Sequence, residues 1–69
     1  MTDLVYKLTE IVGTSHESSD GALRAAVKRA QETIRHVRWY EVISQRGYVE
    51  DDGKLQFQVV LKVGFSLDG

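Results

Sequence analysis

The segment from residue 55 to residue 67 has an apolar side chain at every second position. Alternation with a period of two is typical of a β-strand that turns one face toward a core and the other face away from it. The alternating apolar residues are Leu55, Phe57, Val59, Leu61, Val63, Phe65 and Leu67. We therefore predict a strand over residues 54–67 that supplies one continuous apolar face.

Two further strands and a turn are predicted around this segment. β-branched and aromatic residues indicate strands at residues 4–12 and 38–50. The sequence Asp51–Gly53 is typical of a tight hairpin turn, because glycine adopts positive φ without strain. This turn makes the last two strands antiparallel neighbours.

The stretch between the first two strands predicts one amphipathic helix. Its apolar residues recur at spacings of four and three, at Leu23, Val27, Ala30, Ile34 and Val37. Small side chains beside this stripe favour close packing: Ala22, Ala25 and Ala26. We expect Ser18, Ser19 or Asp20 to cap the helix. The sequence thus predicts an α+β fold: β-α-β-β, a three-stranded antiparallel sheet wrapped around one helix, as a single domain over residues 1–69.

The predicted helix is too short for the apolar face that it must cover. A helix of about 18 residues is about 27 Å long, whereas a strand of about 13 residues is about 43 Å long. A chain of 69 residues is also near the lower limit for independent folding, and it has no cysteine to form a disulfide. These features predict a homo-oligomer in which another copy covers the surplus surface.

Charge and hydropathy argue against several classes of protein. The net charge is −1, with 9 basic and 10 acidic residues, whereas nucleic-acid-binding domains are usually clearly basic. The first 13 residues are too short and too often interrupted by charge for a signal peptide or a membrane span. We therefore expect a cytoplasmic protein that binds neither nucleic acid nor membrane.

Few residues are suited to catalysis or metal binding. His16 lies in a serine-rich loop and His36 near the helix end, and we interpret both as surface residues and expect no metal site. Glu10 and Glu41 are candidates for paired acid–base carboxylates, but nothing in the sequence places them together. We do not expect an enzyme.

The strongest candidate for a binding residue is Trp39, the only tryptophan. If Tyr40 and Val42 face the core, Trp39 shares the outer face of the sheet with Gln58. An indole offers a flat face for stacking, and an amide offers both a donor and an acceptor to the edge of a heteroaromatic ligand. The alternative is that Trp39 anchors an oligomer interface, and the pattern alone leaves both interpretations open.

An anionic tail on such a ligand requires a cation, and Arg46 is the candidate. A guanidinium pairs well with phosphate or carboxylate. Strict alternation, however, places Arg46 on the inner face. A binding role for Arg46 therefore requires a twist or bulge, which we predict near Gly47.

Short motifs spread along most of the chain resemble those of the dodecins, small flavin-binding proteins. They are an alanine-rich helix together with EIVGTS (10–15), WYEV (39–42), RG (46–47), FQV (57–59) and KVGF (62–65). The resemblance implies a hollow dodecamer with flavins bound between subunits. It also implies that two flavins stack between the tryptophans of two symmetry-related subunits.

The resemblance also implies roles for individual residues. Trp39 would stack on the isoalloxazine ring, and Gln58 would hydrogen-bond its polar edge. Arg46 would lie near a flavin phosphate, which favours FMN over riboflavin, with riboflavin and FAD as the alternative flavins, and Ser44 would touch the ribityl chain. One departure is Ser66, where relatives often have an arginine, so that one phosphate contact is lost.

The function implied by the resemblance is flavin binding, storage and buffering, with the indole quenching the excited flavin. Some bacterial relatives also bind coenzyme A, which would involve the positions of Lys7 and Arg29. Two alternatives remain at this point. One is a flavin-dependent redox enzyme, and the other is a purely structural oligomer without a physiological ligand.

Overall fold

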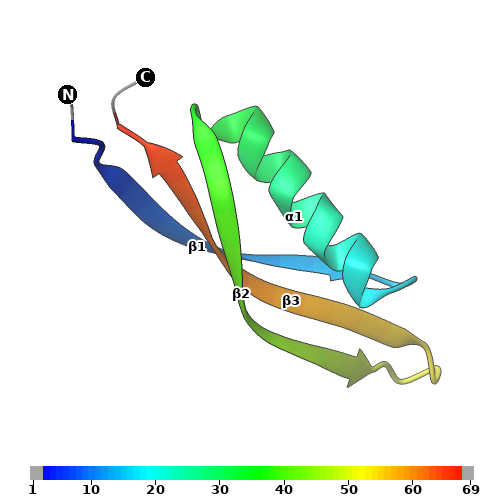
Figure 1. Cartoon of the computed structure of the whole chain (residues 1–69). Helices are drawn as coiled ribbons and strands as arrows, with labels where there is room; N and C mark the ends of the chain where they lie inside the picture. The colour runs from blue at the N-terminus through cyan, green and yellow to red at the C-terminus, as the bar shows by residue number, and fades with distance from the viewer. Residues whose placement is uncertain (1–2, 68–69) are drawn as a thin grey trace.

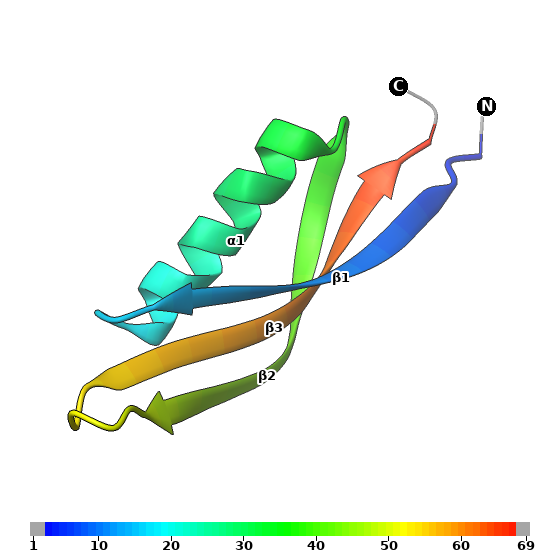
Figure 2. The same cartoon turned by 180° about the vertical axis from the view of Figure 1, so that it is seen from behind.

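The computed structural model describes residues 3–67, which form one helix and one antiparallel sheet. Strands β1 (Tyr6–Ser15), β2 (Val37–Val49) and β3 (Leu55–Ser66) pair in the order β1-β3-β2. Helix α1 (Ser19–Thr33) lies on one side of this sheet (Figure 1). Seen from behind, the three strands form a strongly twisted sheet (Figure 2). The predicted β-α-β-β fold is confirmed.

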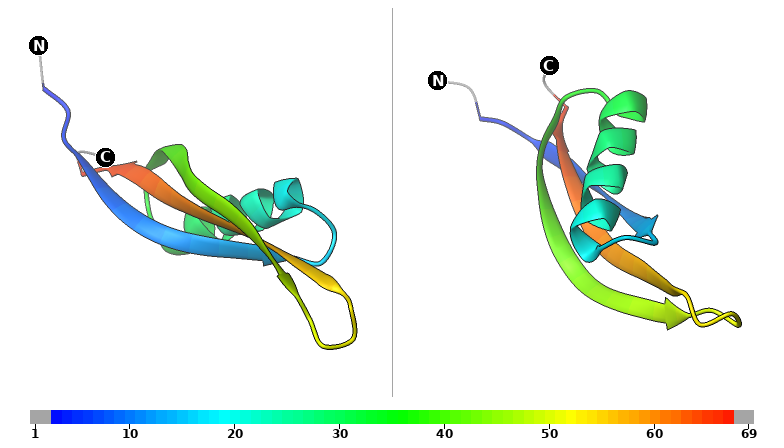
Figure 3. Two further views of the ribbon diagram at one scale, coloured as in Figure 1. Left: turned by 90° about the horizontal axis from the view of Figure 1, so that it is seen from below. Right: turned by 90° about the vertical axis from the view of Figure 1, so that its right-hand side faces the viewer.

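Strand β3 occupies the centre of the sheet and supplies the middle of the core. Val59, Leu61 and Val63 are fully buried, as their alternating positions predict. The same face is uncovered at its two ends, where Leu55 is 50% exposed and Leu67 is 57% exposed. The sheet curves around α1 but extends past it, most clearly at the β2–β3 hairpin (Figure 3). The predicted overhang of the apolar face is therefore present in the single chain.

The helix is shorter than the sequence predicts, and its most deeply buried residues are alanines. Ile34 has an extended backbone and caps the C-terminal end, and Val37 already belongs to β2. The buried residues of α1 are Ala22, Ala26 and Ala30. The larger Leu23 and Val27 lie partly buried around them, and Ala25 is exposed. The alanines face inward because only small side chains allow α1 to approach the sheet this closely.

Gly13 is the position on β1 that permits this approach. It lies opposite the buried Val59, on the side of the sheet that α1 covers. A Cβ atom at Gly13 would overlap the backbone carbonyl of Ala22 and would lie 2.8 Å from the Cβ of Ala26.

The first turn of the helix is fixed by Ser18, one of the three predicted caps, whose hydroxyl accepts a 2.9 Å hydrogen bond from the Gly21 N–H.

Candidate functional site

The face of the sheet opposite α1, here called the open face, carries the residues singled out in the sequence. Residues directly opposite one another on antiparallel strands point to the same side. Because the odd-numbered Val59, Leu61 and Val63 of β3 are buried against α1, the even-numbered Gly64 and Gln58 belong to the open face. Gly64 lies opposite both Leu8 of β1 and Trp39 of β2. Trp39 and Gln58 therefore share one face, as predicted.

A register shift in β2 decides which of its later side chains reach the open face. Val42 lies opposite Leu61, whereas Ser44 lies opposite Val60. Two positions along β2 thus correspond to a single position along β3, which is the pattern of a β-bulge. A one-residue slip of this kind moves every later side chain to the other face. Ser44 consequently lies on the open face.

The bulge corrects the sequence prediction for Arg46. Strict alternation places this residue on the helix side, and its binding role required a bulge near Gly47. The irregularity that moves Arg46 is the one between Val42 and Ser44, and Arg46 lies directly opposite Gln58 on the open face. Arg46 is exposed, and in the described part of the chain no carboxylate forms an ion pair with it.

The indole of Trp39 lies over the backbone of β3. It occupies the space that a side chain at Gly64 would fill, and it remains 39% exposed. Tyr6 of β1 meets the indole edge-on, with ring centroids 6.4 Å apart and an interplanar angle of 71°. Sequence reasoning missed Tyr6, because only the strand register brings β1 and β2 together across β3.

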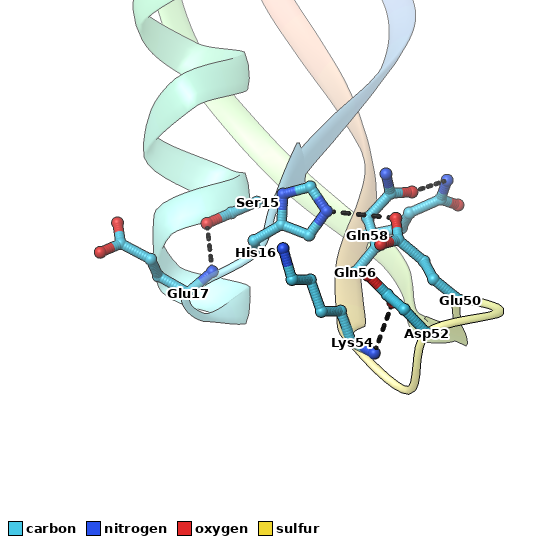
Figure 4. Close-up of polar contacts among 8 residues, drawn as sticks. All are labelled: Ser15, His16, Glu17, Glu50, Asp52, Lys54, Gln56 and Gln58. Carbon is cyan, nitrogen blue, oxygen red and sulfur yellow. Dashed lines mark hydrogen bonds and ion pairs between the residues drawn. The ribbon is translucent and has the colours of Figure 1, made fainter.

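The side-chain amide of Gln58 is oriented by its neighbour on the same face. Its Nε2 atom donates a 3.3 Å hydrogen bond to Oε1 of Gln56, which leaves the Gln58 Oε1 atom to accept from a ligand (Figure 4). A second contact drawn there joins His16 Nε2 to Glu50 Oε2 at 3.1 Å. The His16 side chain is 59% exposed, which confirms its interpretation as a surface histidine. Gln56 is another residue that sequence reasoning missed.

A row of three charges crosses the open face between Trp39 and Gln58. Glu10 of β1 and Glu41 of β2 both lie opposite Lys62 of β3. The two glutamates are therefore on one face, which the sequence did not show. They are separated by the width of two strand spacings, about 10 Å, with a lysine between them. This arrangement does not provide two carboxylates in contact for acid–base catalysis.

The two candidate coenzyme A residues lie away from the open face. Lys7 lies opposite Phe65, and it therefore belongs to the helix side of the sheet. Arg29 is exposed on α1 and forms an ion pair with Glu32 at 3.8 Å. The structure does not bring either residue into the group around Trp39.

Ser66, the position of the expected departure from the family, lies at the edge of the open face. It is opposite Tyr6 and is only 7% exposed. Its backbone N–H donates a 2.9 Å hydrogen bond to the carbonyl of His36. An arginine at this position would lie beside the Trp39–Tyr6 pair.

Two further observations concern the described residues. No group of three His, Cys, Asp or Glu side chains gathers there to hold a metal ion. The one helix is neither long nor apolar enough to cross a membrane.

The pKa of Arg24, on the exposed side of α1, is raised by its hydrogen bond to Asp20 and by the negative charge of that residue. This ion pair is remote from the open face.

Comparisons with known proteins cover nearly the whole chain. A family model described as Dodecin matches residues 5–68. A dodecin from Thermus thermophilus is 48% identical over 64 residues, which cover 93% of this chain and 93% of that protein. A calcium dodecin from Mycobacterium tuberculosis is 36% identical over 63 residues, or 91% of this chain and 89% of that protein. The solved structure of a dodecin from Streptomyces davaonensis superposes with a TM-score of 0.90 at 41% identity, covering 99% of this chain and 100% of that one.

Proposed function

The chain belongs to the dodecin family, and we propose that it binds, stores and buffers a flavin, with FMN as the preferred form. The observation that carries this proposal is the bulge in β2. It puts Arg46 on the same face as Trp39 and Gln58. Strict alternation along β2 would place Arg46 and Trp39 on opposite faces. A stacking surface, an amide and an exposed cation thus share the open face, and these are the groups that the ring, its polar edge and a phosphate tail require.

The spacing along β3 supports a site shared between copies of the chain. Gly64, under the indole, and Gln58 are six residues apart, which corresponds to about 20 Å of strand. This separation exceeds the length of a flavin ring system. One copy therefore supplies the indole on which a flavin stacks, and a neighbouring copy supplies the amide and the guanidinium. The family implies a homo-oligomer, and we propose that it is a dodecamer.

Storage suits this arrangement better than catalysis. A flavin covered by Trp39 on one face and by a second flavin on the other has little room for a substrate at its ring. The open-face carboxylates Glu10 and Glu41 flank Lys62 and are not placed as an acid–base pair. We therefore propose that the protein is not an enzyme. Coenzyme A binding at Lys7 and Arg29 and a cytoplasmic location stay predictions.

Flavin titration is the direct test of the proposal. The purified oligomer should quench the fluorescence of added FMN and bind riboflavin less tightly, and titration with FAD shows whether the larger flavin is accepted. Calcium, which appears in the name of the M. tuberculosis relative, is tested in parallel by calorimetry. Absence of quenching by an intact oligomer would contradict flavin storage and favour a structural role. Steady turnover of a reductant with bound flavin would favour a redox enzyme.

Arg46→Ala should narrow the preference for FMN over riboflavin. If the guanidinium contacts the phosphate, its loss should weaken FMN binding by about 1–3 kcal/mol and leave riboflavin binding almost unchanged. Titration of both ligands at moderate salt measures the difference. Arg35→Ala is the matched control, because it removes an exposed arginine that lies outside the open face. Equal affinity of the wild-type protein for FMN and riboflavin would remove this role from Arg46.

A further inference from the structure

The indole of Trp39 lies against residues of both other strands, Gly64 of β3 and Tyr6 of β1. Side chains on a sheet normally stand away from it and next to those of the adjacent strand. A Cβ atom at Gly64 would lie 2.6 Å from Nε1 of Trp39 and closer still to Cε2. The missing side chain at Gly64 is therefore what lets the indole lie across β3.

Tyr6 contacts the indole on the side of β3 away from β2, beyond the space that a side chain at Gly64 would fill. Tyr6 belongs to β1 and Trp39 to β2, and these strands do not pair with each other because β3 lies between them. Their rings nevertheless come to a centroid distance of 6.4 Å with an interplanar angle of 71°. This is the favourable edge-to-face geometry of aromatic pairs. The contact spans the width of the sheet, and it depends on Gly64 leaving the path open.

We propose that Tyr6 is a positioning residue that fixes the orientation of the Trp39 indole before a flavin binds. This inference rests on the proposed flavin function. A perpendicular contact occupies at most one face of the indole, and stacking of a flat ligand needs only one. An indole already held in place loses less side-chain freedom when the ligand stacks on it. Tyr6 therefore strengthens flavin binding without touching the flavin.

The experiment compares Tyr6→Leu with Tyr6→Phe in the assembled protein. Because Trp39 is the only tryptophan, the anisotropy decay and the near-ultraviolet circular dichroism of the indole report on its orientation without flavin. Leucine removes the ring and should increase the motion of the indole, while flavin affinity falls roughly two- to tenfold. Phenylalanine keeps the ring and should match wild type in both measurements. Val12→Ala is the control, since it removes apolar surface from the same face of β1 beside Val60, away from Trp39.

Gly64→Ala tests the same arrangement from the sheet side, and it decides the question if Tyr6→Leu does not assemble. The added methyl group must displace the indole, so flavin affinity should fall at least as far as in Tyr6→Leu. The inference would be overturned if the anisotropy decay and circular dichroism of the indole were unchanged in whichever of the two variants assembles. It would also be overturned if the indole became mobile while the flavin affinity stayed at the wild-type value. If the wild type binds no flavin, the proposed function fails, whereas the flavin-free signals still decide whether Tyr6 holds the indole.

Discussion

Trp39→Ala is expected to weaken flavin binding by about 1–3 kcal/mol, the range measured for bases stacked on aromatic side chains. Any flavin that remains bound should fluoresce more strongly, because the electron-rich indole that quenches it is gone. Trp39→Phe should keep part of the affinity and quench less, since a phenyl ring is a poorer electron donor. Titration followed by flavin fluorescence measures both effects on one sample.

The size of the oligomer separates this prediction from the alternative role of Trp39 as an interface anchor. Truncation of an anchor should dissociate the oligomer, and flavin would then be lost only as a consequence. Light scattering on the titrated samples distinguishes the two cases. Tyr40→Ala is the matched control, because Tyr40 is an aromatic residue of the same strand, 49% exposed, on the helix side of the sheet. An intact Trp39→Ala oligomer that binds and quenches flavin like wild type would exclude Trp39 from the site.

Alternation in β3 predicts most of the fold, because its apolar face defines inside and outside for the whole sheet. The same alternation fails in β2. Side chains alternate between the two faces of a strand only where its pairing is regular. Nothing in the sequence indicates that β2 has one extra residue between Val42 and Ser44. The face of Arg46 follows from that residue, and for this reason its placement required the structure.

The helix shows a different limit of sequence reasoning. Its large apolar residues predict a stripe through Leu23 and Val27, yet its buried positions are alanines. A hydropathy pattern identifies large apolar side chains, whereas close packing of a helix on a sheet requires small side chains. The glycine of the opposing strand, Gly13, was the signal for this close approach. Contacts that depend on register, such as Tyr6 with Trp39, have no comparable signal in a single sequence.

Gly13→Ala is expected to destabilise the fold by about 2–3 kcal/mol, toward the upper end of the range for overpacked cores. The added methyl group would meet the backbone carbonyl of Ala22, which cannot rotate away as a flexible side chain can. The helix must therefore move off the sheet, and the buried contacts of Ala26 weaken with it. Urea unfolding followed by circular dichroism measures the loss, at one fixed subunit concentration because assembly adds to apparent stability.

Gly47→Ala is the control that isolates this steric cause. Gly47 is also a strand glycine, but a Cβ atom there would meet only the carbonyl oxygen of Gln56, at an ordinary 3.7 Å. Alanine at this position should leave stability unchanged or raise it slightly, because it restricts the unfolded chain. Equal effects of the two substitutions would show that the close approach of α1 to β1 is not what Gly13 provides. A large loss of stability in Gly13→Ala alone would show that the added methyl group disrupts the contact between helix and sheet. That contact matters for the site, because the curvature of the sheet around α1 shapes the open face.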